Sequence, residues 1–413
     1  NEGMYNEPDG IFLPPPRPRC YELMIKEACG RIGVPCIPSR LSILTKPLNG
    51  RAACHYCGQC NRGCATNSNF SSPSVLIRPA METGRLTLVP NAMCREVVTD
   101  DEGLATGVSY VDTRDQQEYQ VNARVVVLAA STCETARLLL NSKSPRHPNG
   151  LANSSDVVGR YLMDTTSSGV SAFVPKLMDG HPHNDDGVGG MHVYVPWWLD
   201  GQKLDFLRGY HIELYGGRGM PGYGFMGGIQ RYNGLGREKG GGGYGAELKD
   251  DYRRLYGSVL TFSAEGETIA RKENRCEIDP DVVDRFGIPV LRFHVKWTDQ
   301  EYLQVKHAQT TMREIMHAMG GITLDEMPGK EEGYGIRKPG EDIHEVGTAR
   351  MGNDPRSSVL NRHCQAHDCR NLFVADGGPF VTVAHKNPTW TILALAWRTA
   401  DYIAEERKRG NLR

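Results

Sequence analysis

Residues 124–140 read RVVVLAASTCETARLLL, and this stretch decides the fold class of the chain. The run from Val125 to Ala130 is continuously apolar, which is typical of a strand that is buried on both faces of a parallel sheet. Ser131 and Thr132 then offer an N-cap, and a helical pattern continues to Asn141. Together they form half of a nucleotide-binding βα unit, whose helix N-terminus faces a phosphate or is capped by its own serine.

A second α/β element lies near the C-terminus. Residues 371–376 read NLFVAD, which predicts a buried strand that ends in Asp-Gly-Gly, and a long apolar helix is expected over 389–405. Further helices are expected at 20–31 and 299–319, and short strands at 85–90, 96–99, 105–111, 259–264, 275–278 and 290–295. The pattern predicts a mixed α/β chain, α+β overall, with a mostly antiparallel sheet between two α/β regions.

Length and charge exclude several classes of protein. The 413 residues suit two or three domains. The 48 basic and 49 acidic residues leave a net charge of -1, which lacks the electrostatic footprint of a nucleic-acid-binding protein. The longest aliphatic stretch is too short for a transmembrane helix, and no signal peptide is visible.

Residues 216–245 contain 14 glycines, which predicts a surface excursion. Within them, residues 217–222 match the G-x-G-x-x-G pattern. We reject it as a dinucleotide fingerprint, because Pro221 lies inside the turn and more glycines follow in place of a helix.

Four cysteines lie close together in one loop. Cys54, Cys57, Cys60 and Cys64 have the spacing C-x2-C-x2-C-x3-C of a bacterial ferredoxin run, with Ala65 in place of the usual proline. The spacing predicts an iron–sulfur cluster that is held by four or by three of these thiolates. Three alternatives stay open, namely reduced thiols, two disulfides, and a four-cysteine zinc site, although zinc sites usually pair two CxxC units across a longer gap.

The C-terminal seventy residues carry three spaced motifs. Residues 344–352 read HEVGTARMG, residues 371–377 read NLFVADG, and residues 385–389 read HKNPT. In this order they resemble the C-terminal signature of the glucose–methanol–choline (GMC) family of FAD-dependent oxidoreductases. Residues 125–140 and 156–164 are similar to that family's flavin-contacting strand and helix and to its entry into the substrate domain.

The resemblance implies a site. The motif histidine maps to His344 and the second flavin-facing residue to Asn387. A neutral imidazole can take the hydroxyl proton of an alcohol near neutral pH, and an amide hydrogen bond can orient the hydroxyl. Residues implied to bind FAD are Asp376, Gly377, Asn387, Pro388, Ala130 and Cys94.

The resemblance also implies a domain organisation. Residues 1–80 are expected to form a linker or cap region that includes the cysteine loop 54–64. Residues 81–164 and 336–413 would be the middle and C-terminal parts of a Rossmann-like FAD-binding domain, with 165–335 inserted as the substrate domain. The strand, GxGxxG turn and helix that open this family's pattern are not found, so an N-terminal FAD-binding segment is expected to be missing from this chain.

The expected function is FAD-dependent oxidation of an alcohol group of a sugar, a polyol or a related molecule, by a dehydrogenase rather than an oxidase. Some membrane-associated sugar dehydrogenases of the family carry a three-iron cluster near a comparable loop. A 3Fe-4S or 4Fe-4S cluster here would pass electrons to a cytochrome- or quinone-linked subunit. The same resemblance suggests a periplasmic or membrane-associated location. The alternative is a non-catalytic structural or interaction subunit that kept the GMC-like fold.

Overall fold

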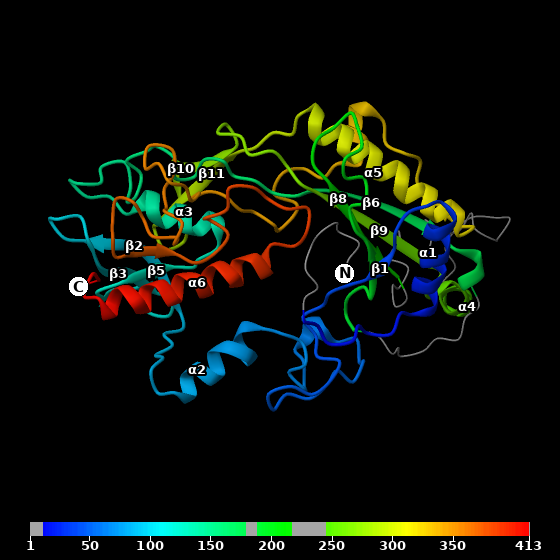
Figure 1. Cartoon of the computed structure of the whole chain (residues 1–413), viewed down its shortest axis with the longest axis horizontal. Coiled ribbons are helices and arrows are strands. Elements are labelled where there is room, and N and C mark those ends of the chain that lie inside the picture. The colour runs from blue at the N-terminus through cyan, green and yellow to red at the C-terminus, as the bar shows by residue number, and fades with distance from the viewer. Residues whose placement is uncertain (1–10, 179–187, 217–244, 413) are drawn as a thin grey trace. The chain divides into compact units, whose positions relative to one another are not determined.

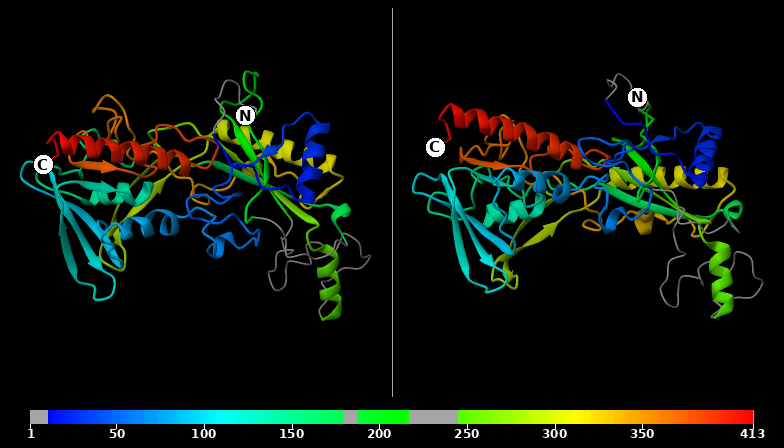
Figure 2. Two further views of the ribbon diagram at one scale, coloured as in Figure 1. Left: turned by 60° about the horizontal axis from the view of Figure 1, so that its bottom comes forward. Right: turned by 90° about the horizontal axis from the view of Figure 1, so that it is seen from below.

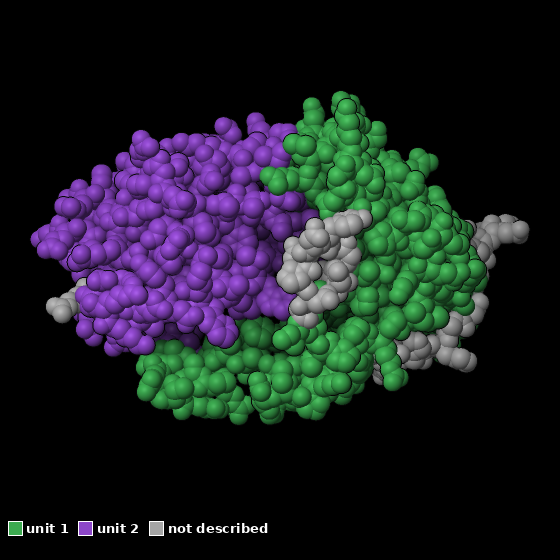
Figure 3. Space-filling view, viewed as in Figure 1, with its two compact units in different colours: residues 1–87, 167–266, 299–336 green, residues 88–166, 267–298, 337–413 purple. Residues whose placement is uncertain are grey.

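We describe the chain from a computed structural model, which covers residues 11–178, 188–216 and 245–412. The chain divides into two compact units, shown in Figure 3. Unit 1 comprises residues 1–87, 167–266 and 299–336, and unit 2 comprises residues 88–166, 267–298 and 337–413. Each unit is built from three separate stretches of the chain, and the stretches of the two units alternate along the sequence.

Unit 1 is organised around one six-stranded sheet. Its strand order is β1-β7-β8-β9-β6-β12, and the pairs β1/β7, β7/β8, β8/β9 and β6/β12 are antiparallel. The strands are β1 (Ile37–Pro38), β6 (Thr166–Phe173), β7 (Val193–Val195), β8 (Tyr210–Tyr215), β9 (Val259–Gly266) and β12 (Ile322–Thr323). Figures 1 and 2 show the long helix α5 (Asp299–Ala318) lying along this sheet, with α1 (Cys20–Arg31) beside it.

Alternation along the strands explains the core of unit 1. Ile212 and Leu214 of β8 and Phe262 of β9 point to one face, where they pack with α5 residues that include Met312 and Ile315. The other helical elements of this unit are short: η1 (Cys60–Arg62), η2 (Pro73–Ile77), α2 (Arg78–Glu82), η3 (Pro175–Leu177), α4 (Ala246–Leu255) and η5 (Lys330–Gly335).

Unit 2 contains three small sheets. The meander β2-β3-β4 is antiparallel, the hairpin β10-β11 is antiparallel, and β5 and β13 form a parallel pair. The elements are β2 (Ala92–Thr99), β3 (Ala105–Asp112), β4 (Glu118–Asn122), β5 (Val126–Leu128), α3 (Thr132–Asn141), β10 (Arg275–Val283), β11 (Pro289–His294), β13 (Leu372–Val374) and α6 (Thr389–Lys408). The parallel pair joins the two α/β regions that the sequence indicated.

Several expectations are confirmed, and others are wrong. The four predicted helices, the meander and the two parallel strands are present. Residues 85–90 form no strand, because an alternating pattern needs a hydrogen-bonding partner and these residues are exposed. Residues 125–130 are not buried on both faces, since Val127 is 45% exposed. Helix α4 was not expected.

The units group some residues differently from the expected domains. Residues 267–298, which we expected in the substrate domain, belong to unit 2, and residues 1–87 belong to unit 1. Contacts of α3 with the β10-β11 hairpin are consistent with the first difference. The guanidinium of Arg137 on α3 binds Asp284 in the turn of the β10-β11 hairpin at 2.7 Å and also donates to the carbonyls of Ile288 and Pro289.

Two further observations concern the chain as a whole. The expected glycine-rich excursion and the GxGxxG string at 217–222 lie outside the described residues, apart from the ends of the excursion. Within the described ranges, no helix combines the length and the apolar character needed to cross a bilayer.

Candidate active site

Residues 344–351 form a connecting strip in the middle of unit 2. Val346 pairs with Met163, the amide of Gly347 donates to the carbonyl of Gly377 at 3.0 Å, and Thr348 donates to the carbonyl of Thr132 at 2.7 Å. These bonds tie the strip to three separate parts of the unit. The position of His344, at the start of the strip, is therefore set by backbone geometry and not by its side chain alone.

The structure brings His344 and Asn387 together, as expected. The amide Nδ2 of Asn387 lies 3.2 Å from Nε2 of His344, and the hydroxyl of Thr165 lies 3.1 Å from Nδ1. An amide N–H can only donate, so Nε2 accepts this bond and carries no proton. The proton of the neutral imidazole then lies on Nδ1, which donates to Thr165. In this tautomer the lone pair of Nε2 can accept a proton once the amide of Asn387 turns away from it.

Asp164 adds a titratable group beside the imidazole. Its Oδ1 accepts hydrogen bonds from the backbone amides of Thr165 at 2.8 Å and His344 at 3.2 Å. Burial, followed by the nearby carboxylates of Glu345 and Asp342, raises the pKa of Asp164 to about 7. A carboxyl that changes charge near neutral pH next to a candidate base is typical of a functional site.

Sequence reasoning missed the roles of Asp164 and Thr165. Asp164 closes the stretch 156–164, which resembled the entry to the substrate domain, and Thr165 follows it. Both residues therefore lie at the end of a stretch that resembles the family pattern. Their contact with His344 spans about 180 positions of the chain, so no local pattern predicts it.

The carboxyl ends of β5 and β13 meet the start of α3. A Cβ built on Gly377 would lie 2.4 Å from the hydroxyl oxygen of Thr132, so only glycine fits at this approach. Ser131, between β5 and α3, has a φ of 77°, which is uncommon for a residue with a side chain. Ligands of parallel α/β sheets bind at such an edge, outside the carboxyl ends of the strands.

This edge fits FAD. Both carboxylate oxygens of Asp376 are used within the chain, since Oδ2 accepts from Thr135 at 2.5 Å and Oδ1 from the amide of Gly378 at 2.7 Å. Burial raises the pKa of Asp376. Among the described residues, by contrast, the backbone N–H groups of Asp376 and Gly377 have no acceptor. These two N–H groups and the free N–H groups that open helix α3 are donors for a phosphate- or flavin-bearing ligand.

The remaining expected FAD residues have different surroundings. Pro388 is the N-cap of α6, and its carbonyl accepts from the amide of Ile392. Ala130 is exposed just beyond β5, and its amide donates to the hydroxyl of Thr135 at 3.3 Å. Cys94 lies on β2 and packs at the edge of the core of unit 2. Burial and the charge of Glu96 raise the pKa of its thiol.

The cysteine loop lies in unit 1, and none of its four cysteines is in a disulfide within the described residues. Three sulfurs accept backbone N–H groups: Cys54 from Tyr56 at 3.3 Å, Cys60 from Gly189 at 3.1 Å and Cys64 from Asn69 at 3.5 Å. Burial acts against ionisation of Cys64, but hydrogen bonds from the Asn69 amide and from the hydroxyls of Ser68 and Thr66 lower its pKa to about 6. Burial raises the pKa of Cys54. Donors to sulfur are a feature of iron–sulfur sites.

The positions of the loop sulfurs bear on the zinc and disulfide alternatives. Within the described residues, no three of the loop sulfurs lie within 4.8 Å of one another, so they do not form a site for a single metal ion. Disulfides are not formed either. The iron–sulfur cluster stays a prediction, which the N–H donors to sulfur support.

Known proteins resemble this chain over most of its length. Two family models, both described as GMC oxidoreductase, match residues 21–166 and 270–396. The chain is 31% identical to 2-methyl-1,2-propanediol dehydrogenase of Mycolicibacterium austroafricanum, covering 95% of this chain and 67% of that protein. It is 28% identical to the fructose dehydrogenase large subunit of Gluconobacter japonicus, covering 93% and 65%.

A third curated relative and one solved structure are also similar to this chain. The gluconate 2-dehydrogenase flavoprotein of Pantoea cypripedii is 29% identical, with 86% of this chain and 56% of that protein covered. A formate oxidase variant from Aspergillus oryzae has a TM-score of 0.56 at 15% identity, covering 82% of this chain and 63% of that one. This structural likeness concerns the fold alone. The chain spans 56–67% of the length of the three curated relatives.

Proposed function

Because this chain belongs to the GMC oxidoreductase family, we propose that it oxidises an alcohol group of a sugar, a polyol or a related small molecule. Bound FAD would supply the chemistry of accepting a hydride from the alcohol carbon. The observation that carries the proposal is the contact between His344 and Asn387, at 3.2 Å, on a strip that backbone bonds hold in place.

Each residue of the pair has its own role in the proposed reaction. Nε2 of His344 accepts the proton of the substrate hydroxyl, while Thr165 keeps the other imidazole proton on Nδ1. The amide of Asn387 can turn from Nε2 to the substrate oxygen, where an N–H donor stabilises the negative charge that develops as the proton leaves. The amides of Asp376 and Gly377 and the start of α3 would hold the cofactor.

The direct test is flavin reduction in the full-length protein. The purified protein is expected to be yellow, and anaerobic addition of a sugar, polyol or diol from a substrate panel should bleach the flavin absorbance. A flavin-loaded protein that no member of the panel reduces would contradict the proposal. A protein that binds no flavin would favour the non-catalytic subunit.

We also propose that the protein is a dehydrogenase, in which electrons pass from the flavin to an acceptor other than oxygen. The cysteine loop is the candidate relay, because three of its sulfurs accept N–H groups as cluster thiolates do. Iron analysis of anaerobically prepared protein, with electron paramagnetic resonance of its oxidised and reduced forms, tests this step. Active protein without iron would rule out a cluster at Cys54, Cys57, Cys60 and Cys64.

A relay of this kind needs an acceptor. We propose a cytochrome- or quinone-linked subunit as the partner and a periplasmic or membrane-associated location for the complex. The relative from Gluconobacter japonicus is itself named as a large subunit, which supports a multi-subunit assembly. Co-purification from the native cell under mild conditions, followed by haem staining and fractionation, tests both points. Full activity of the isolated chain with oxygen would contradict them.

A further inference from the structure

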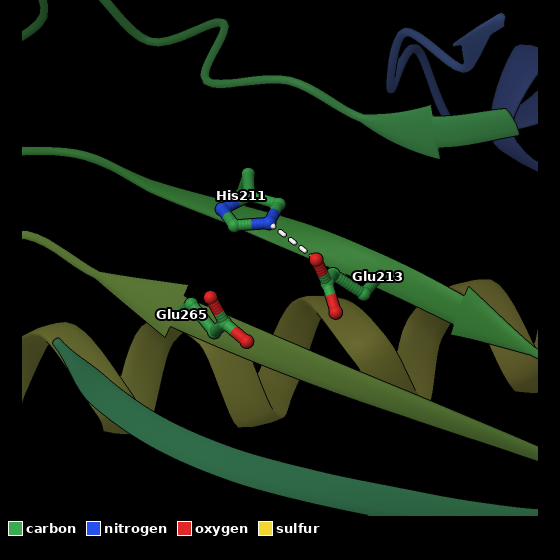
Figure 4. A group of neighbouring side chains, drawn as sticks. All are labelled: His211, Glu213 and Glu265. Atoms are coloured by element: carbon green, nitrogen blue, oxygen red, sulfur yellow. Dashed lines mark hydrogen bonds and ion pairs between the residues drawn. The ribbon is translucent and has the colours of Figure 1, made fainter. Parts of the chain in front are cut away.

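One face of the sheet in unit 1 carries three side chains that are able to bind a metal ion. His211 and Glu213 lie two residues apart on β8, and Glu265 on β9 is the direct cross-strand partner of His211. Alternate residues of a strand share a face, so all three side chains leave the sheet on the same side. The intervening Ile212 points to the opposite side, into the core with α5. Figure 4 shows the three groups together on the neighbouring strands.

The distances fit a common ion. One ligand atom from each of the three residues lies within 4.8 Å of the other two, and Nε2 of His211 lies 3.2 Å from Oε1 of Glu213. Ligand atoms around a first-row metal ion are roughly 3 to 3.5 Å apart when the bonds are about 2.1 Å long. The His211–Glu213 edge therefore already has the required length, and Glu265 needs only a small side-chain movement.

Burial makes this group unusual for a surface cluster. The exposed fraction is 0% for His211, 4% for Glu213 and 7% for Glu265. Glutamates are rarely buried to this extent unless an ion pair or a metal ion compensates their charge. One imidazole and two carboxylates offer the nitrogen and oxygen donors that a divalent first-row cation binds.

Outer contacts orient two of the three ligands. The hydroxyl of Tyr215 donates to the second carboxylate oxygen of Glu213, which leaves Oε1 directed to His211. The ring of Tyr194 on β7 meets the imidazole of His211 edge-on, at 6.1 Å between ring centres. Partners that bond or pack against a ligand are a regular feature of protein metal sites.

We propose that His211, Glu213 and Glu265 form a divalent-cation site within unit 1. A donor set of one imidazole and two carboxylates suits Mn²⁺ and the neighbouring first-row ions. The ion would link the adjacent strands β8 and β9 on the face away from α5. Every ligand and every contact used for the proposal lies in unit 1.

Mn²⁺ is the probe, because the thiolates of the cysteine loop favour softer ions. Full-length protein is freed of metal with a chelator and titrated with Mn²⁺, and the free ion is followed by electron paramagnetic resonance. We expect one bound ion per chain. Glu265→Gln should weaken binding more than about 100-fold, since loss of an outer partner alone costs about 10–100-fold. Tyr215→Phe should fall in that smaller range.

Glu277→Gln is the matched control. Glu277 also pairs with a histidine, His294, at 2.8 Å, but no third ligand joins them within the described part of the chain. Its substitution should leave Mn²⁺ binding unchanged. Absence of saturable binding by the folded wild-type protein, or equal binding by Glu265→Gln, would overturn the site.

A second measurement covers the case in which Glu265→Gln does not fold. Pulsed electron paramagnetic resonance of Mn²⁺ bound to the wild-type protein should show coupling to one imidazole nitrogen. The melting temperature of the wild-type protein should also rise with Mn²⁺, because an ion that binds only the folded state stabilises it. Bound Mn²⁺ without nitrogen coupling would exclude His211 as a ligand and with it the site.

Discussion

The side-chain amide of Asn387 donates to Nε2 of His344 at 3.2 Å, across 43 residues of sequence. The bond directs the unprotonated nitrogen of the imidazole toward the start of α6. His344 is buried, whereas Asn387 is exposed. The pair thus combines a candidate base of fixed orientation with an exposed partner side chain.

Replacement of His344 by alanine tests the base directly. Without Nε2 the hydroxyl proton has no acceptor, so the rate of flavin reduction should fall about 10²–10⁴-fold. Stopped-flow reduction of the flavin-loaded protein measures it. His294→Gln is the control, because that histidine lies on the β10-β11 hairpin and pairs with Glu277. Equal rates for His344→Ala and the wild type would remove His344 from the proposed mechanism.

Asn387→Ala should act on kcat more than on stability. Loss of a donor to a developing oxyanion costs about 10²–10³-fold in kcat. Asn387 is exposed, so its truncation should change the free energy of unfolding by no more than about 0.5 kcal/mol. A variant that changes only KM would show that Asn387 binds the substrate without stabilising the transition state.

Asp164→Asn should change the pH dependence of stability. The pKa of Asp164 is raised from 3.8 to about 7 in the folded chain, so the folded state binds the proton more tightly than the unfolded state. The wild-type protein should therefore lose stability as pH rises from about 4 to 7, by roughly 4 kcal/mol at most. The asparagine variant, which cannot ionise, should lack this component.

Denaturant unfolding of both proteins across this pH range measures the difference. The amide oxygen of asparagine can still accept from the Thr165 and His344 amides, so the fold of the variant should be preserved. Parallel pH curves for the two proteins would mean that Asp164 does not titrate in this window.

Gly377→Ala should destabilise unit 2 and weaken flavin binding. The new methyl group would lie 2.4 Å from the hydroxyl oxygen of Thr132, which is itself bonded to the carbonyl of Glu345 at 2.6 Å. Relief of such overpacking costs about 1–3 kcal/mol. Thermal unfolding and flavin content are the measurements. Gly329→Ala, which meets nothing within 4 Å, is the control and should behave as the wild type.

The helices could be predicted from the sequence because their signals are local. Apolar residues at helical spacing mark α1, α5 and α6 within their own segments. The strand predicted for residues 85–90 was wrong. A strand depends on a partner elsewhere in the chain, and residues 85–90 lie exposed beyond α2.

By itself, the sequence indicated the α/β character of the chain through local periodicity, and its resemblance to the GMC family implied the His344–Asn387 pair. Only the tertiary structure decided which groups surround that pair and which side chains share a face of a sheet. Thr165 reaches His344 from 179 positions away, and Glu265 reaches His211 through strand register. Register and long-range backbone bonds arise from the packing of whole elements, so no local stretch of sequence encodes them.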